Sequence, residues 1–353
     1  MSKRTIFLET AFWEGFSECP KSLASFAEGT DPVMNVERIS KWNSIYKLLL
    51  RSDILIDTPL DRLADKASSD SFLRHLLKSN GDGKMALEYQ EEPFPNLDRS
   101  EEFEYDDDYL ALYFTGQEHH KGAQKHGVIN VCLDDIWNQQ NRFKDSGEAM
   151  RADTGWGWNS MDILKENSNS LVIIDNYIIS VKANGYWSMR RDLKDLLGLI
   201  LPYDSSCEYC ISLFYLDKSV NDNERENLKK LCSDTISSWI KNNRKNLRFR
   251  LELFPTIENW PSHRKDFHDR TIITNNIWIG SEAGFDLLIP DRAMSTSTRV
   301  TKSTKTHGLY LGFGEEAANW LDKAYDDLIE DAKRSLRKNH FSTENKLLLD
   351  YDS

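Results

Sequence analysis

The sequence predicts an α/β protein built from two domains. Short β-branched and apolar runs alternate with segments in which apolar residues recur at helical spacing, which is typical of sheets flanked by helices. The length of 353 residues is sufficient for two hydrophobic cores. We expect an α/β N-terminal domain over residues 1–145, a polar, glycine-containing connector over 146–168, and a second domain over 169–353, in which helices flank a mixed sheet and a long helix lies near the C-terminus.

The N-terminal half predicts strands over residues 5–8, 54–57 and 128–133, with helices over 36–50 and 69–77. Acidic residues stand after these strands at Glu9, Asp57, Asp134 and Asp135. Carboxylates at the carboxyl ends of parallel strands can hold Mg²⁺ or Mn²⁺ for phosphodiester hydrolysis. This ring resembles that of PIN-like nucleases, which open with an aspartate where this chain has Glu9. Acids after strands are also ordinary helix caps and turn formers, so both interpretations stay open.

A strongly acidic segment covers residues 91–108, where Arg99 is the only basic residue. A charge block of this kind is typical of a solvated loop, and a docking site for a partner protein is the alternative. The net charge of −12 comes mostly from the first 150 residues. We therefore expect no general basic face, and any contact with nucleic acid must be local.

The C-terminal half predicts strands over residues 170–175, 209–216 and 247–254, with helices over 189–201, 223–243 and 315–337. The run Ser170–Asp175 is apolar until its last residue, as in a strand covered on both faces of its sheet. A β-branched strand at 271–274, an Asn275–Asn276 turn and a returning strand at 277–279 predict a hairpin. His268, Asp269 and Arg270 stand at its mouth, where a histidine and an arginine together can bind a phosphate.

The order of these elements, ending in the His-Asp-Arg hairpin, resembles one half of a phospholipase D-like fold over residues 168–290. It is most similar to the phospholipase D-like C-terminal domain of MIT-domain proteins, in which such a hairpin precedes a GxxxD element, here within 280–286. Compared with the HxKx4D motif of that superfamily, His268 is in register, Arg270 replaces the lysine and Asn275 replaces the acid. The resemblance implies retained phosphate binding, and catalysis only in a homodimer that brings two His268 residues together. The predicted phosphate-binding residues are His268, Arg270, Asn275, Ser281, Arg299, Lys302 and Lys305.

Several features indicate a cytoplasmic protein without a membrane span. No apolar run approaches the ~20 residues that cross a bilayer, and the N-terminal segment lacks the pattern of a signal peptide. The odd number of cysteines, 5, favours a reducing compartment. Cys207 and Cys210 form a CxxC without a second pair, so we expect no zinc, and no cofactor beyond the metal of the acidic ring.

Three functions remain open at this stage. The first is a non-catalytic component that recognises phosphate or nucleic acid within a multi-protein system, such as one for antiphage defence. The second is a nuclease that acts through His268 in a homodimer or through the acidic ring with a divalent metal. The third is a scaffold for protein interactions. The sequence does not decide whether the chain is an enzyme.

Overall fold

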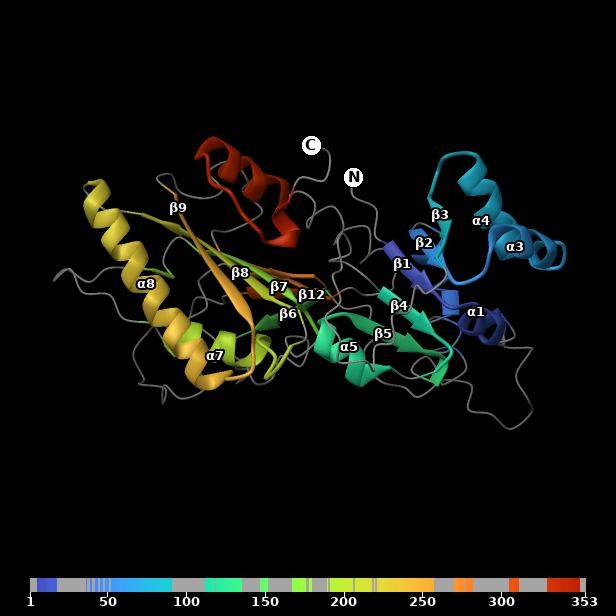
Figure 1. Cartoon of the computed structure of the whole chain (residues 1–353), viewed down its shortest axis with the longest axis horizontal. Helices are drawn as coiled ribbons and strands as arrows, with labels where there is room; N and C mark the ends of the chain where they lie inside the picture. The colour runs from blue at the N-terminus through green and yellow to red at the C-terminus, as the bar shows by residue number, and fades with distance from the viewer. Residues whose placement is uncertain are drawn as a thin grey trace. The chain divides into compact units, whose positions relative to one another are not determined.

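A computed structural model shows two compact units, which are described separately (Figure 1). Unit 1 comprises residues 1–145 and 311–320, and unit 2 comprises residues 146–310 and 321–353. The structure describes residues 5–17, 52–90, 112–117, 119–134, 147–151, 167–175, 178, 179, 189, 191–205, 207–217, 219, 221–256, 270–275, 277–281, 305–310 and 329–349, together with scattered positions between 36 and 50.

Unit 1 contains a parallel sheet of five strands, sheet A, with the order β3-β2-β1-β4-β5. The strands are β1 (Thr5–Leu8), β2 (Asp53–Ile56), β3 (Leu87–Tyr89), β4 (Leu112–Thr115) and β5 (Ile129–Cys132). The strand order reverses between β1 and β4. In open α/β sheets, ligands bind beyond the carboxyl ends of the strands at such a switch point.

Helices cover both faces of sheet A. One buried cluster joins Ile6 and Leu8 of β1 to α1 (Thr10–Ser17), α3 (Leu60–Ala67) and α4 (Ser71–Gly81). On the opposite face, Phe7 stacks on Tyr113 with ring centroids 4.5 Å apart, and α5 (His120–His126) contributes Ala123 to that cluster. The alternation of apolar side chains along β1 therefore places a helical layer on each side.

Unit 2 contains a mixed sheet of seven strands, sheet B, with the order β6-β12-β11-β10-β7-β8-β9. The strands are β6 (Gly147–Arg151), β7 (Ser170–Asp175), β8 (Tyr209–Leu216), β9 (Phe249–Thr256), β10 (Arg270–Thr274), β11 (Ile277–Ser281) and β12 (Lys305–Tyr310). Strands β7, β8 and β9 are parallel, and the remaining pairings are antiparallel.

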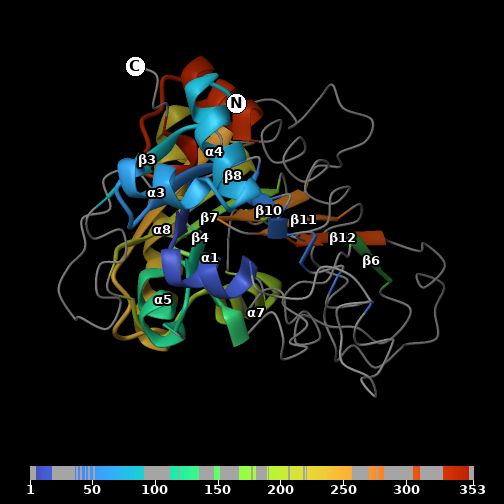
Figure 2. The same cartoon turned by 90° about the vertical axis from the view of Figure 1, so that its right-hand side faces the viewer.

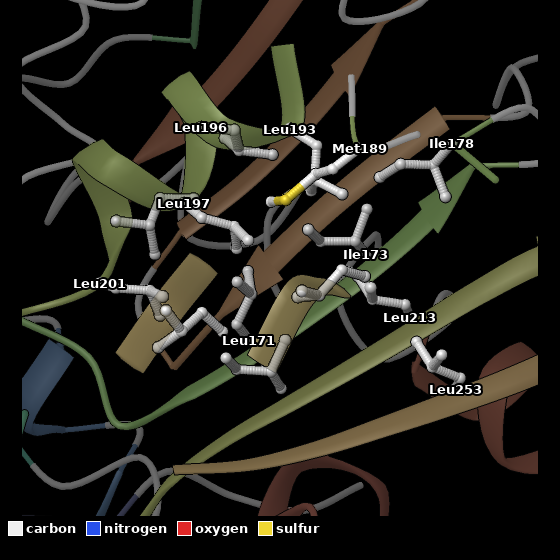
Figure 3. Packing of buried hydrophobic residues seen from close by; sticks show 14 of the residues in the cluster. Leu171, Ile173, Ile178, Met189, Leu193, Leu196, Leu197, Leu201, Leu213 and Leu253 are labelled. Carbon is white, nitrogen blue, oxygen red and sulfur yellow. The ribbon is translucent and has the colours of Figure 1, made fainter. Parts of the chain in front are cut away.

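Sheet B is also covered on both faces where β7, β8 and β9 lie. On one face, α7 (Arg191–Ile200) and α8 (Asp222–Asn243) pack on Leu171, Ile173 and Leu213 (Figure 3). The helix at residues 329–338 lies on the other side of the sheet (Figure 1). The chain then returns along the sheet to the 3-10 helix η7 (Lys346–Leu348), where the amide of Asn345 donates to the Leu171 carbonyl at 3.2 Å.

The predicted α/β class is confirmed, and the main differences concern short or polar elements. Helices α1, α3 and α5 and strands β3, β4 and β12 were not predicted. The segment predicted as a connector begins with β6, an edge strand of sheet B. Among the described residues, no helix is both long and apolar enough to cross a membrane.

Candidate phosphate site

The mouth of the predicted hairpin lies at the carboxyl end of sheet B. The parallel strands β7, β8 and β9 finish at this end. Strand β7 ends here at Asp175. Strand β10 runs antiparallel to β7 and therefore begins here, with Arg270 directly opposite Asp175 in the register. His268 and Asp269 lie outside the described residues, but they immediately precede β10 in the chain.

Strands β10, β11 and β12 lie side by side (Figure 2), and their register brings further predicted phosphate-binding residues to the same end. In the hairpin, Thr271 pairs with Gly280, so Ser281 reaches the carboxyl end beside Arg270. Ser281 in turn pairs with Thr306, next to Lys305 at the start of β12. Arg270, Ser281 and Lys305 therefore lie at one end of three adjacent strands, which are ~4.8 Å apart. Because consecutive residues of a strand alternate between the two faces, Arg270 and Ser281 share one face, and Lys305, one residue before Thr306, belongs to the other.

A fourth strand adds a basic residue that sequence reasoning missed. Arg151, the last residue of β6, pairs directly with Lys305. The strand Gly147–Arg151 is short and without apolar alternation, and it lies in the segment predicted as a connector, so no sequence signal indicated it.

Asn275, at the position of the superfamily's acid, is at the opposite end of β10 from Arg270. Its side chain is buried, with 2% exposure. The Oδ1 atom accepts hydrogen bonds from the backbone N–H groups of Asn169 and Ser170, each at 3.0 Å, and Nδ2 donates to Oδ1 of Asn169 at 2.6 Å. Five residues of strand separate Asn275 from the carboxyl end, so its side chain fixes the start of β7 and is not part of a site with Arg270.

Two carboxylates also lie at this end of sheet B, on Asp175 and Asp217. Asp175 is the last residue of β7 and is 4% exposed. Asp217 follows β8 and accepts from Nε of Arg225 at 2.5 Å and from the Ser219 hydroxyl at 2.6 Å. Burial acts to raise the pKa of Asp217, but the hydrogen bonds from Ser219 and the ion pair with Arg225 outweigh it and lower that pKa.

Comparison with known proteins adds no name to this geometry. No protein-family model matches the chain, and no curated protein matches it. The phospholipase D-like resemblance therefore stays a prediction that depends on the order of elements and on the hairpin. Of its remaining phosphate-binding residues, Arg299 and Lys302 lie outside the described residues, as does His268.

Two of the four acids predicted to form a metal ring in unit 1, Asp57 and Glu9, accept hydrogen bonds from the backbone. Asp57 Oδ1 accepts from the backbone N–H of Thr10 at 2.9 Å and from its hydroxyl at 2.5 Å, so it caps the first turn of α1. Glu9 Oε2 accepts from the backbone N–H of Gly116 at 2.5 Å, which joins the ends of β1 and β4 at the switch point. Both carboxylates therefore have a structural role without a metal.

Asp134, which follows β5, is exposed, and Asp135 lies outside the described residues. Within the part of the chain that the structure describes, no three His, Cys, Asp or Glu side chains are grouped closely enough to hold a metal ion. The Mg²⁺ or Mn²⁺ ring thus remains a prediction that requires Asp135 to complete it.

Proposed function

We propose that the carboxyl end of sheet B binds phosphate groups of nucleic acid without cleaving them. The observation that carries this proposal is the register of β10 and β11, which brings Arg270 and Ser281 to one end of the sheet and to the same face. An arginine offers a phosphate a bidentate pair of donors, and a hydroxyl adds a single donor. Lys305 and Arg151, which pair directly with each other on β12 and β6, add positive charge at the same end of the sheet.

The position of Asn275 favours binding over catalysis. In the phospholipase D-like motif HxKx4D, the acid is one of three residues, together with the histidine and the lysine. Here the corresponding residue is an amide that is engaged with Asn169 and Ser170 at the far end of β10. The carboxylate that would orient a nucleophilic histidine is therefore missing from this chain's hairpin.

The test compares Arg270→Ala with Arg250→Ala. Arg250 lies on β9 of the same sheet, toward the amino end of the parallel strands, and it pairs with Glu208 at 2.9 Å. Both variants replace an arginine by alanine, so they change the net charge equally. Affinity for a fluorescent oligonucleotide is measured over a salt series. We expect Arg270→Ala to weaken binding and to reduce the slope of log K against log salt by about 0.7–0.9, the contribution of one phosphate contact. Arg250→Ala should retain the wild-type slope, and equal slopes for all three proteins would refute the proposal.

Cleavage is the second candidate function, and the same preparation tests it. A histidine-dependent homodimer would cleave a labelled oligonucleotide in EDTA and lose activity in His268→Ala. A nuclease with an acidic metal ring would require Mg²⁺ or Mn²⁺ and would lose activity in Asp57→Ala. We expect intact oligonucleotide under both conditions.

We further propose that the protein acts within a multi-component system in the cytoplasm, such as one for antiphage defence. The acidic segment 91–108, which lies outside the described residues, is the proposed docking site for a partner protein. Deletion of this segment should abolish co-purification of the partner and leave oligonucleotide binding by unit 2 unchanged. Co-purification that survives the deletion would contradict the docking role.

A further inference from the structure

A second surface of unit 2, at the C-terminal ends of α7 and α8, presents a rigid aromatic ring. Tyr203 is 75% exposed, although it lies close to the sheet core. Its ring rests on the guanidinium of Arg244, whose Cζ atom is 4.2 Å from the ring centroid. A cation over an aromatic face is attracted by the ring quadrupole, so one face of Tyr203 is held by Arg244 while most of its surface stays in solvent.

Arg244 is itself fixed by the backbone. It is 7% exposed, and its guanidinium donates to the carbonyls of Leu201 and Asn243, each at 3.0 Å, and to that of Gly198. These carbonyls lie at the ends of the two helices, where the helix dipole is negative. Arg244 thus neutralises an end that would otherwise repel an anion, and it orders the Tyr203 ring before any ligand binds.

Basic residues are concentrated next to this ring in the sequence, in contrast to the acidic chain as a whole. Residues 241–248 contain Lys241, Arg244, Lys245 and Arg248 and no acid, and the exposed Asp204 is the acid adjacent to Tyr203. Lys241, Lys245 and Arg248 are exposed. A parallel β-bridge joins Asp204, in the loop after α7, to Asn246, in the loop after α8. Tyr203 and Lys245 each stand one residue before a bridge residue, so they are neighbours across the two loops. Within the described residues, neither Lys241 nor Lys245 forms an ion pair, which leaves both charges for a ligand.

We infer that this surface, formed by Tyr203, Lys241 and Lys245, binds single-stranded nucleic acid. An exposed ring flanked by cations is the combination that single-strand-binding proteins use, because a base stacks on the ring while the phosphates meet the cations. Bases inside a duplex are already stacked on one another, so a duplex offers only its phosphates to this surface. The surface is distinct from the carboxyl end of sheet B, and it gives unit 2 a second point of contact with the same class of ligand.

The test measures fluorescence anisotropy of a labelled oligothymidine of about 20 nucleotides, longer than the ~4–16 that one single-strand-binding fold occupies. Loss of one stacked base should weaken binding about 5- to 150-fold in Tyr203→Ala, while Tyr203→Phe, which keeps the ring, should bind like wild type. Tyr89→Ala is the matched control, because Tyr89 is an exposed tyrosine of unit 1, at 43% exposure. The double variant Lys241→Ala/Lys245→Ala should lower the salt slope by about 1.4, the sum of two single-strand phosphate contacts.

The outcomes separate this inference from the proposed phosphate site. Equal affinities for Tyr203→Ala and Tyr89→Ala, in proteins with unchanged circular dichroism, would overturn the single-strand surface. So would a duplex of the same length that competes as well as the single strand. A loss in Arg270→Ala alone would overturn this inference and support the hairpin site, and a loss in the Tyr203 and lysine variants alone would do the reverse.

Discussion

Replacement of Asn275 by alanine tests most sharply how the hairpin is built. The substitution removes the acceptor of two backbone N–H groups, those of Asn169 and Ser170, and the donor to the Asn169 amide oxygen. Each buried polar group left without its partner costs about 1–3 kcal/mol. Because water can enter the space left by a polar side chain and restore part of this loss, we expect unfolding of unit 2 to become easier by about 2–5 kcal/mol.

The assay is urea unfolding followed by circular dichroism, with Asn246→Ala as the control. Asn246 is exposed, and its substitution should change the unfolding free energy by less than about 0.5 kcal/mol. Asn275→Asp restores the acid of the HxKx4D motif but places a charge in a buried position, so it should also destabilise and should not produce cleavage. A stable Asn275→Ala protein with reduced phosphate affinity would refute the structural role and return Asn275 to the binding site.

Two further predictions concern unit 1. Burial, and secondarily Lys125, lowers the pKa of His126, so this fully buried side chain is neutral in the folded protein. The stabilising contribution of neutral His126 is therefore present above the unfolded pKa of about 6.5 and is lost as the pH falls through the pKa of the folded protein. The urea midpoint of the wild type should drop between about pH 7.5 and pH 5, and that of His126→Leu should drop less. Parallel pH profiles of the two proteins would contradict this. Asp57→Ala removes the cap on Thr10 and should cost about 1 kcal/mol in urea unfolding, whereas Asp57→Asn still accepts and should cost less; stabilisation of the wild type by Mg²⁺ that is lost in both variants would instead support the metal ring.

The sequence predicted the elements that are apolar and bounded by clear breakers. The run Ser170–Asp175 reads as a strand because both faces of the sheet are covered, and the structure buries all six of its residues. The long helix α8, predicted over 223–243, begins at Asp222, and the side chain of Asn221 caps it by accepting from the N–H of Glu224 at 3.0 Å.

Other features depend on contacts that no local pattern carries. Strand β6 is held by its pairing with β12, more than 150 residues later in the chain, so its own composition gave no signal. The motif alignment grouped Asn275 with Arg270 because the two residues are close in the sequence. In the structure they lie at opposite ends of the extended strand β10. The ring of Tyr203 is held by Arg244, which belongs to another loop. A tyrosine in a polar loop does not by itself predict such a contact.

The most direct test of the central claim is photo-crosslinking of the full chain to a short oligonucleotide, followed by mass spectrometry of the crosslinked peptides. We expect crosslinks in unit 2, at peptides that contain Arg270, Ser281 or Lys305. Crosslinks confined to unit 1, at the ends of β1 and β4 around Glu9, would contradict the assignment of phosphate recognition to the carboxyl end of sheet B.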